Sequence, residues 1–160
     1  MTDARVVIAE ETGDTFWPEA DALCREHFAE VEGSLAEVRP YEPDVPMLRM
    51  LNGQGIFKIV TARIDGRLVG YYTWTVMRDV ESASLLVATQ GAWYCSPDPE
   101  CRGVAFMLHD HSIKILREMG CGGVFMHHRL LGRGRKLGAF FRRKGAVEIK
   151  HEYYLPLKGA

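Results

Sequence analysis

Hydrophobic and polar residues follow two different periods along this chain, and each change of period marks a predicted element. The apolar run Val6 to Ala9 predicts a short strand, and Thr12 to Thr15 after it are typical of a turn and a helix cap. Apolar residues then recur at helical spacing from Phe16 to Val31, with Pro18 expected in the first turn. The prolines from Pro40 to Pro46 predict an irregular crossing.

From Ile56 the hydrophobic period changes to two, which predicts strands. Ile56 to Ile64 alternates, Asp65-Gly66 is typical of a hairpin turn, and Leu68 to Val76 returns as the partner strand. Leu85 to Cys95 is predicted to be a long third strand, and its nearly continuous apolar character favours burial on both faces. These segments together predict an antiparallel meander.

Helices and short strands are predicted on either side of this meander. Met47 to Leu51 suggests a short helix, and the segment from Arg102 to Gly120 carries one apolar stripe and ends on a glycine suited to a left-handed C-cap. Gly123 to His127 reads as a strand, Leu130 to Lys144 contains a further helix, and Val147 to Leu155 is predicted to be the last strand.

The order of these elements predicts an α/β fold, with hairpins in the first half and crossover connections in the second. The chain has 160 residues, of which 47% are hydrophobic, so it is long enough to bury a sizeable core without metal or disulfide staples. We therefore expect one domain spanning residues 1–160.

The overall charge excludes some classes of partner. The formal net charge of −1 gives no general attraction to nucleic acid or to an anionic membrane surface. No apolar run approaches the length of roughly 20 residues that a membrane span needs, and the chain does not start with a leader pattern. We expect a cytoplasmic protein that does not use a membrane. The charge is unevenly distributed, since acidic residues gather in the N-terminal part and basic residues between Arg129 and Lys144.

Neither cysteine nor histidine spacing predicts a metal site. The four cysteines contain no Cys-x-x-Cys pair, which argues against a zinc site or a disulfide framework. His109 and His111 are two positions apart on a predicted helix, so they do not share a face and cannot chelate one ion. We expect no bound metal.

The segment that carries most chemical information joins the third strand of the meander to the next helix. The aromatic strand end Trp93-Tyr94-Cys95 is followed by a turn, and Arg102-Gly103-Val104-Ala105 opens the helix. Backbone N–H groups point forward at a helix N-terminus, where the macrodipole favours an anion. A phosphate or pyrophosphate is therefore predicted to bind there.

These residues resemble the GCN5-related N-acetyltransferase superfamily, whose turn reads Arg/Gln-x-x-Gly-x-Gly/Ala. The closest register here runs from Arg102 to Met107, and it is preceded by a similar run at Pro97, Pro99 and Glu100. Ala105 and Met107 replace the two later glycine positions, and Met107 is tolerable if its side chain points into the core. A second register keeps Gly103 and Ala105 but places Glu100 where arginine or glutamine belongs.

The hairpin Asp65 to Tyr71 and the segment Phe140 to Ala146 extend the resemblance over most of the chain, from about Val6 to Leu157. The resemblance implies a mixed, centrally splayed β-sheet flanked by helices, with acetyl-coenzyme A as co-substrate. Strand-end backbone groups would hold its pantetheine arm, and turn amides its pyrophosphate. The cofactor-binding residues implied in this way are Trp93, Tyr94, Cys95, Arg102, Gly103, Val104, Ala105, Phe106 and Met107.

Acyl transfer to an amine also needs groups that move protons. The tyrosine that often protonates the coenzyme thiolate in this superfamily corresponds to Phe141, which has no proton to give. Water could replace it, a tyrosine at position 94, 153 or 154 could, or the protein relies on positioning alone. Since an amine must lose a proton before it attacks, a base is needed, and histidine has a suitable pKa. The candidates for catalysis are Gln90, Tyr94, His127 and His128.

The resemblance implies transfer of acetyl to a primary amine by direct attack, with a small molecule or a macromolecule as acceptor. In this superfamily acidic N-terminal helices usually wall the acceptor side, so we expect a cationic amine. Alternatives are a nucleobase or protein acceptor, and an inactive module that only binds coenzyme A. An RNA-binding sandwich is disfavoured by the neutral charge balance. A homodimer is compatible with the sequence.

Overall fold

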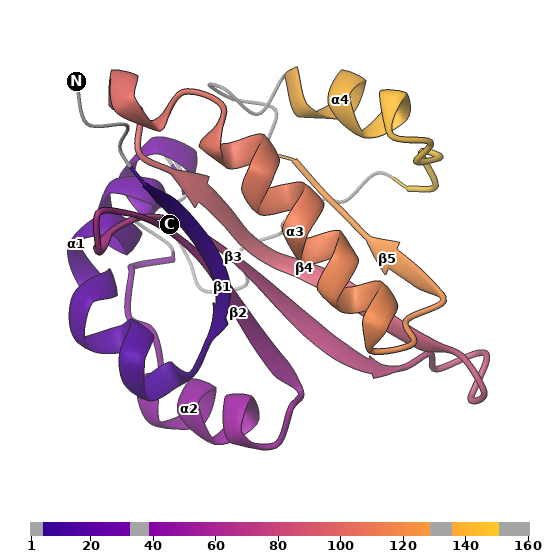
Figure 1. Ribbon diagram of the computed structural model, residues 1–160. Helices are drawn as coiled ribbons and strands as arrows, with labels where there is room; N and C mark the ends of the chain where they lie inside the picture. Colours follow the sequence, from indigo (N-terminus) through magenta and orange to yellow (C-terminus); the bar gives the residue numbers. More distant parts are fainter. Residues whose placement is uncertain (1–4, 33–38, 129–135, 151–160) are drawn as a thin grey trace. The chain divides into compact units, whose positions relative to one another are not determined.

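A computed structural model describes residues 5–32, 39–128 and 136–150, and it contains a mixed sheet of five strands in the order β1-β2-β3-β4-β5 (Figure 1). Contacts divide the chain into two compact units, Met1–Cys24 with Asp44–Met126, and Arg25–Pro43 with His127–Ala160. The whole sheet lies in the first unit. The elements are β1 (Val6–Glu11), α1 (Gly13–Glu32), α2 (Val45–Gly53), β2 (Phe57–Ile64), β3 (Arg67–Arg78), β4 (Leu86–Cys95), a 3-10 turn (Pro99–Cys101), α3 (Val104–Glu118), β5 (Gly123–Phe125) and α4 (Leu137–Arg143).

The predicted meander is confirmed. Strands β1 to β4 pair antiparallel with their neighbours, and β5 adds to β4 in parallel after the crossover through α3. The turn between β2 and β3 has positive φ at Asp65 (48°) and Gly66 (85°), as a two-residue hairpin loop requires. Gly120 follows the C-cap residue of α3, Met119, and has a positive φ of 85°, which confirms the left-handed glycine predicted at the end of this helix.

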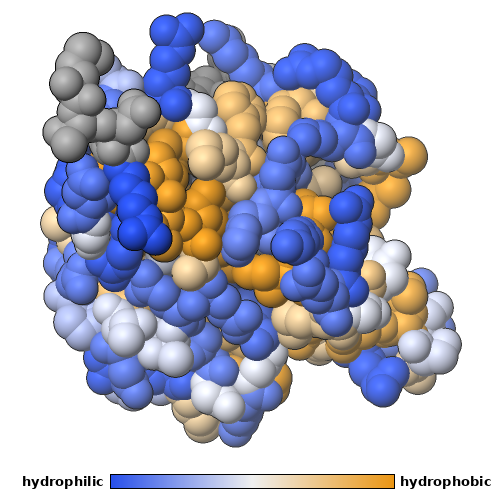
Figure 2. All heavy atoms as spheres, viewed as in Figure 1, coloured by the Kyte–Doolittle hydropathy of each residue, from blue (hydrophilic) through white to orange (hydrophobic). Residues whose placement is uncertain are grey.

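The core of the first unit lies between the sheet and α3. Tyr72 and Trp74 of β3 are completely buried there, together with Leu108 of α3. The outer face of α3 is hydrophilic, whereas hydrophobic surface is visible between α3 and β1 (Figure 2). On the other face of the sheet Phe16 of α1 packs edge-on against Tyr71, with 5.5 Å between the ring centroids. Both faces of β3 are therefore covered, whereas β4, for which the apolar pattern predicted burial on both faces, has Thr89 and Gly91 exposed.

Two prolines lie elsewhere than the sequence predicted. Pro18 is inside α1 rather than in its first turn, because the helix already begins at Gly13, after Thr12 has accepted the N–H groups of the following turn. Pro46 is part of α2 rather than of an irregular crossing. Asp44 caps that helix by accepting the Met47 amide at 3.0 Å, and a proline is tolerated in a first turn because its missing N–H would have had no helical partner.

The C-terminal segment differs from the prediction where it is described. Residues 147–150 are not in a strand, and residues 151–155 of the predicted last strand lie outside the described residues. The predicted helix between Leu130 and Lys144 is present as α4, Leu137–Arg143. No helix among the described residues is long and apolar enough to span a membrane.

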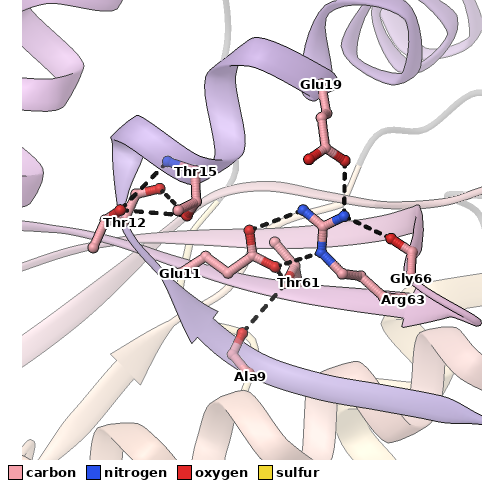
Figure 3. A network of polar contacts seen from close by, with 8 residues as sticks. All are labelled: Ala9, Glu11, Thr12, Thr15, Glu19, Thr61, Arg63 and Gly66. Atoms are coloured by element: carbon pink, nitrogen blue, oxygen red, sulfur yellow. Dashed lines mark hydrogen bonds and ion pairs between the residues drawn. The ribbon is translucent and has the colours of Figure 1, made fainter.

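A network of charged groups ties β1, β2 and α1 together in the first unit (Figure 3). Arg63 donates from Nε and Nη2 to the Glu11 carboxylate at 2.7 and 3.1 Å, and from Nη1 to Glu19 and the Gly66 carbonyl at 2.8 Å each. Thr61 donates a further hydrogen bond of 2.6 Å to Glu11. Hydrogen bonds from Arg63 lower the pKa of Glu11 although burial opposes this, and the pKa of Arg63 is raised. The network explains why β1 extends through two glutamates, beyond the predicted Ala9.

Candidate active site

A β-bulge interrupts β4 in the middle of the sheet. Tyr72 of β3 lies opposite Trp93, but Trp74, two residues further, lies opposite Gln90. Thr73 is therefore matched by two residues of β4, Gly91 and Ala92, which is the two-against-one arrangement that defines a bulge. Bulges re-aim side chains and backbone groups, and they recur next to active sites.

One edge of β4 loses its neighbouring strand at the same point. The parallel pairing with β5 joins Val87 to Gly123 at one end and Thr89 to Phe125 at the other. Beyond Thr89, β4 continues to Cys95 without pairing to β5. The two strands thus share only a short ladder, which agrees with the splayed sheet that the resemblance implied.

The register with β3 shows which backbone groups face this edge. The Ser96 N–H donates to the Val69 carbonyl at 2.8 Å, and in an antiparallel ladder the bonded pairs recur at every second residue. Tyr94 is the next residue bonded to β3. Trp93 and Cys95 consequently direct their N–H and C=O groups away from β3, toward the edge that β5 leaves. These are the groups that the sequence assigned to a pantetheine arm.

The N-terminus of α3 follows this strand end after a short turn. Gly103 is the N-cap residue, with a φ of 86°, and a Cβ at this position would meet no atom within 4 Å. The glycine is required by its left-handed backbone and not by crowding, since other residues adopt that conformation only at a cost. The space beside the cap is open.

Not every amide of the predicted anion site points outward. The Arg102 N–H donates to the Pro99 carbonyl at 3.2 Å, and the N–H groups of Phe106 and Met107 donate to the Gly103 carbonyl at 3.1 and 3.3 Å. The helix therefore leaves three consecutive amides at its start as donors for a ligand. They belong to Gly103, Val104 and Ala105. Three adjacent donors at the positive end of a helix dipole fit a phosphate or pyrophosphate group.

Side chains around this helix start have mixed character. Met107 was expected to be tolerated at a glycine position if its side chain pointed into the core. The side chain is instead 51% exposed. Phe106 is 50% exposed. Arg102 is also exposed, and it forms no ion pair within the described part of the chain, so its guanidinium is available to an anionic ligand.

The turn before α3 carries two carboxylates close to the predicted anion site. Arg67 pairs with both of them, with Asp98 at 3.7 Å and with Glu100 at shorter range. Asp98, Glu100 and the buried Cys101 are also close enough together to hold a metal ion. Arg67 compensates the charge of the two carboxylates, and exposed acidic groups of this kind are common without a metal ion.

Gln90, the first β4 residue beyond the pairing with β5, is buried in a polar and aromatic cluster. Its Oε1 accepts a hydrogen bond of 2.8 Å from the Tyr72 hydroxyl. The Tyr72 ring stacks on Trp93, with 5.0 Å between centroids and 9° between planes, and on His109 at 5.9 Å. Burial raises the pKa of Tyr72 well above its ordinary value, so this hydroxyl remains a neutral donor. Gln90 is thereby held in one orientation at the bulge.

The other catalytic candidates lie in different surroundings. Tyr94 is 6% exposed and its ring lies 6.4 Å from that of Tyr71. His127 and His128 come after the end of β5, in the second unit. Within that unit the His128 ring packs over α4, 6.4 Å from the ring of Phe141 and 2.7 Å from the position that a Cβ on Gly138 would take. Tyr153 and Tyr154 lie outside the described residues. The catalytic roles of all these residues stay predictions.

Sequence reasoning missed three features of this site: the bulge, the Arg67 pairs and the bond from Tyr72 to Gln90. Only the bulge has a signal in the sequence. Gly91 interrupts an otherwise apolar strand pattern, and an isolated glycine in a strand is typical of a bulge. Arg67 and Tyr72 reach their partners through strand register, which local sequence does not encode.

Comparisons with known proteins give fold relatives but no sequence relatives. No family model and no curated protein sequence matches the chain. An aminoglycoside acetyltransferase from an uncultured soil metagenomic sample superposes with a TM-score of 0.71 at 14% identity, over 96% of this chain and 99% of that one. A ribosomal-protein-alanine N-acetyltransferase from Brucella melitensis biovar Abortus 2308 has a TM-score of 0.66 at 20% identity, covering 94% and 98%.

A third similar structure was determined with the co-substrate that the resemblance implied. It is a predicted acetyltransferase with acetyl-CoA from Clostridium acetobutylicum, with a TM-score of 0.66 at 10% identity, covering 96% of this chain and 97% of that one. At such low identities the likeness concerns the fold alone. The chain has the α/β fold of the GCN5-related N-acetyltransferases, with a mixed sheet whose fourth and fifth strands share only a short ladder.

Proposed function

We propose that this protein is an acyl-coenzyme A-dependent N-acetyltransferase that transfers acetyl to a primary amine. The observation that carries the proposal is the coincidence of two features at the end of β4. One is an edge where Trp93 and Cys95 direct their backbone groups away from β3, and the other is the helix start at Gly103, with three adjacent outward amides. An extended arm that ends in a pyrophosphate suits both.

The residues present fit coenzyme A in two places. The strand edge offers alternating N–H and C=O groups to the amide groups of a pantetheine arm, as an added strand would. The Gly103, Val104 and Ala105 amides and the Arg102 guanidinium would hold the pyrophosphate. When bound, acetyl-coenzyme A supplies an activated acyl carbonyl. The protein would hold the acceptor nitrogen over one face of that carbonyl, and positioning of this kind accelerates acyl transfer considerably.

Proton transfers need groups other than the usual tyrosine. Phe141 is buried and cannot donate a proton, so water or a nearby hydroxyl would protonate the leaving thiolate. Gln90 is fixed by Tyr72 and cannot act as a base, although it could orient a water molecule or the acceptor. His127 is exposed, and histidine is the side-chain type that most often serves as a general base near neutral pH. We propose His127 as the first base to test.

A small amine is our proposed acceptor, since one of the similar structures is named as an aminoglycoside acetyltransferase. The acidic face expected to attract a cation is partly neutralised at the start of α1, where Asp14 pairs with Arg49 at 3.5 Å and Glu19 with Arg63 at 2.8 Å. A cationic acceptor would therefore be recognised by acidic groups other than Asp14 and Glu19. Polyamino sugars and peptides that begin with alanine are the first compounds to compare.

The test combines binding with turnover. Native mass spectrometry with acetyl-coenzyme A should show one bound co-substrate per chain, and a thiol-release assay over a panel of amines should identify the acceptor class. Absence of binding at millimolar concentration would refute the proposal. Binding without thiol release from any small amine, peptide or nucleobase would favour a module that binds coenzyme A without turnover, which the buried Phe141 makes the second candidate.

A further inference from the structure

Thr73 of β3 lies directly opposite the two bulged residues of β4, Gly91 and Ala92. We propose that the Thr73 hydroxyl is a positioning group that sets the bulge and thereby the direction of the backbone groups that would bind coenzyme A. The functional half of this inference rests on the proposed function. The structural half, that Thr73 holds the bulge, does not.

A side chain takes the place of a backbone acceptor at this point of the sheet. The Ala92 N–H donates to the Thr73 Oγ1 at 2.8 Å, across from β4 to β3. Thr73 is 5% exposed, so this hydrogen bond is shielded from water. A bulge always leaves one residue out of the ladder, and an amide left without an acceptor in such a place costs free energy. The Thr73 hydroxyl is the acceptor that the Ala92 amide needs.

Gly91 leaves the space that this hydroxyl occupies. A Cβ on Gly91 would lie 2.5 Å from the Thr73 Oγ1, whereas its next neighbours are the Thr73 carbonyl oxygen and Cβ at 3.5 and 3.6 Å. The φ of Gly91 is not positive, so its backbone conformation does not require a glycine. The glycine is explained by the hydroxyl alone. Threonine at 73 and glycine at 91 are therefore complementary.

The bulge decides which residues of β4 face the core and which backbone groups face the open edge. Ala88 of β4 belongs to the core cluster between the sheet and α3. If the side chains of β4 alternated strictly from there, Ala92 and Tyr94 would also point into this cluster. The cluster instead contains Cys95, with Trp93 packed against it. The extra residue in the bulge shifts the alternation by one. After the bulge, each side chain of β4 therefore points to the opposite face of the sheet, and each backbone N–H and C=O points to the opposite edge of the strand. Without the bulge, Trp93 and Cys95 would not present their backbone groups to the edge.

The first experiment measures the bulge directly in the protein without ligand. Amide hydrogen exchange at Ala92 should become about tenfold faster or more in Thr73→Val, which keeps the shape but removes the acceptor. Thr73→Ser should exchange like the wild type. Thr75→Val is the matched control, since Thr75 lies on the same strand and face, opposite Thr89 and outside the bulge. Equal exchange at Ala92 in the Thr73→Val and Thr75→Val proteins would overturn the inference.

The second experiment tests the complementarity of the two residues by stability. Gly91→Ala should lower the unfolding midpoint strongly in the wild type and much less in a Thr73→Ala background, where the atom at 2.5 Å is gone. Additive effects of the two substitutions would contradict the assignment. This cycle also covers the case in which Thr73→Val does not fold well.

The third experiment tests the functional half. Titration with coenzyme A should give a dissociation constant about fivefold or more higher for Thr73→Val than for Thr75→Val, with recovery in Thr73→Ser. The same affinity in both valine variants would show that the bulge does not position the ligand. If the wild type itself binds no coenzyme A, the proposed function fails, while hydrogen exchange and the stability cycle still decide whether Thr73 holds the bulge.

Discussion

Removing the Arg63 guanidinium should destabilise the protein much more than removing another charge from the same strand. Arg63 and Glu11 have side chains only 18% and 15% exposed, and two hydrogen bonds join them. Arg63→Met would leave the Glu11 carboxylate partly buried, with the Thr61 and Thr15 hydroxyls as its remaining donors. Loss of one partner of a buried pair costs 3–5 kcal/mol, and because both groups retain some exposure we expect about 3 kcal/mol.

The control is Lys58→Met on the same strand. Lys58 pairs with Glu10 at 2.8 Å, but Glu10 is 39% exposed, so water can replace the lost contact. We expect this variant to lose about 0.5 kcal/mol, the usual value for a surface pair. Urea unfolding at pH 7 would measure the free energy of unfolding of both variants and the wild type.

The pH dependence gives an independent check. Arg63 lowers the pKa of Glu11 below its ordinary value of 4.5 in the folded protein. A depressed folded pKa adds stability above the unfolded pKa, and this stability is lost as the pH falls through the folded value. The difference between the wild type and Arg63→Met should therefore be largest near neutral pH and shrink below pH 4.5. A difference that stays constant from neutral pH into the acid range, or one no larger than that of Lys58→Met, would refute the reasoning.

Three further outcomes are expected. Gly103→Ala forces a φ of 86° on a residue with a Cβ, so it should lose about 1 kcal/mol of stability in thermal melts and weaken coenzyme A binding in calorimetry, whereas Gly53→Ala should do neither. Tyr72→Phe removes the donor to the buried Gln90 and should cost about 1–2 kcal/mol in urea unfolding; an unchanged midpoint would contradict this. Arg67→Ala leaves two carboxylates uncompensated beside the anion site, so the dissociation constant for coenzyme A should rise, most clearly at low salt; no change with salt would contradict the assignment.

Periodicity predicted the elements well wherever a local signal existed. The Asp65-Gly66 turn and the Gly120 cap follow from residues that tolerate positive φ, and both were confirmed. Pro18 and Pro46 were misplaced because the helices begin earlier than the apolar spacing indicated: α1 starts at Gly13, directly after the cap at Thr12, and α2 starts at Val45, directly after the cap at Asp44.

The site was predictable only in part, and for a physical reason. The location of an anion site at Gly103 follows from sequence, since a glycine-led turn before an apolar-faced helix exposes amides wherever it occurs. The sequence did not show which amides remain free, because this depends on the carbonyls of Pro99 and Gly103, which accept the other amides.

The sequence by itself determined the strands β1 to β5, the main helices and the strand-to-helix turn that carries the resemblance to an acetyltransferase fold, because each of these depends mainly on residues close together in the chain. Only the tertiary structure decided how the bulge that Gly91 signals is paired with β3, the hydrogen bond from Ala92 to the Thr73 hydroxyl, and the guanidinium network around Arg63. These depend on which residue of one strand lies opposite which residue of another. That register is set by the packing of the whole sheet and not by any local pattern.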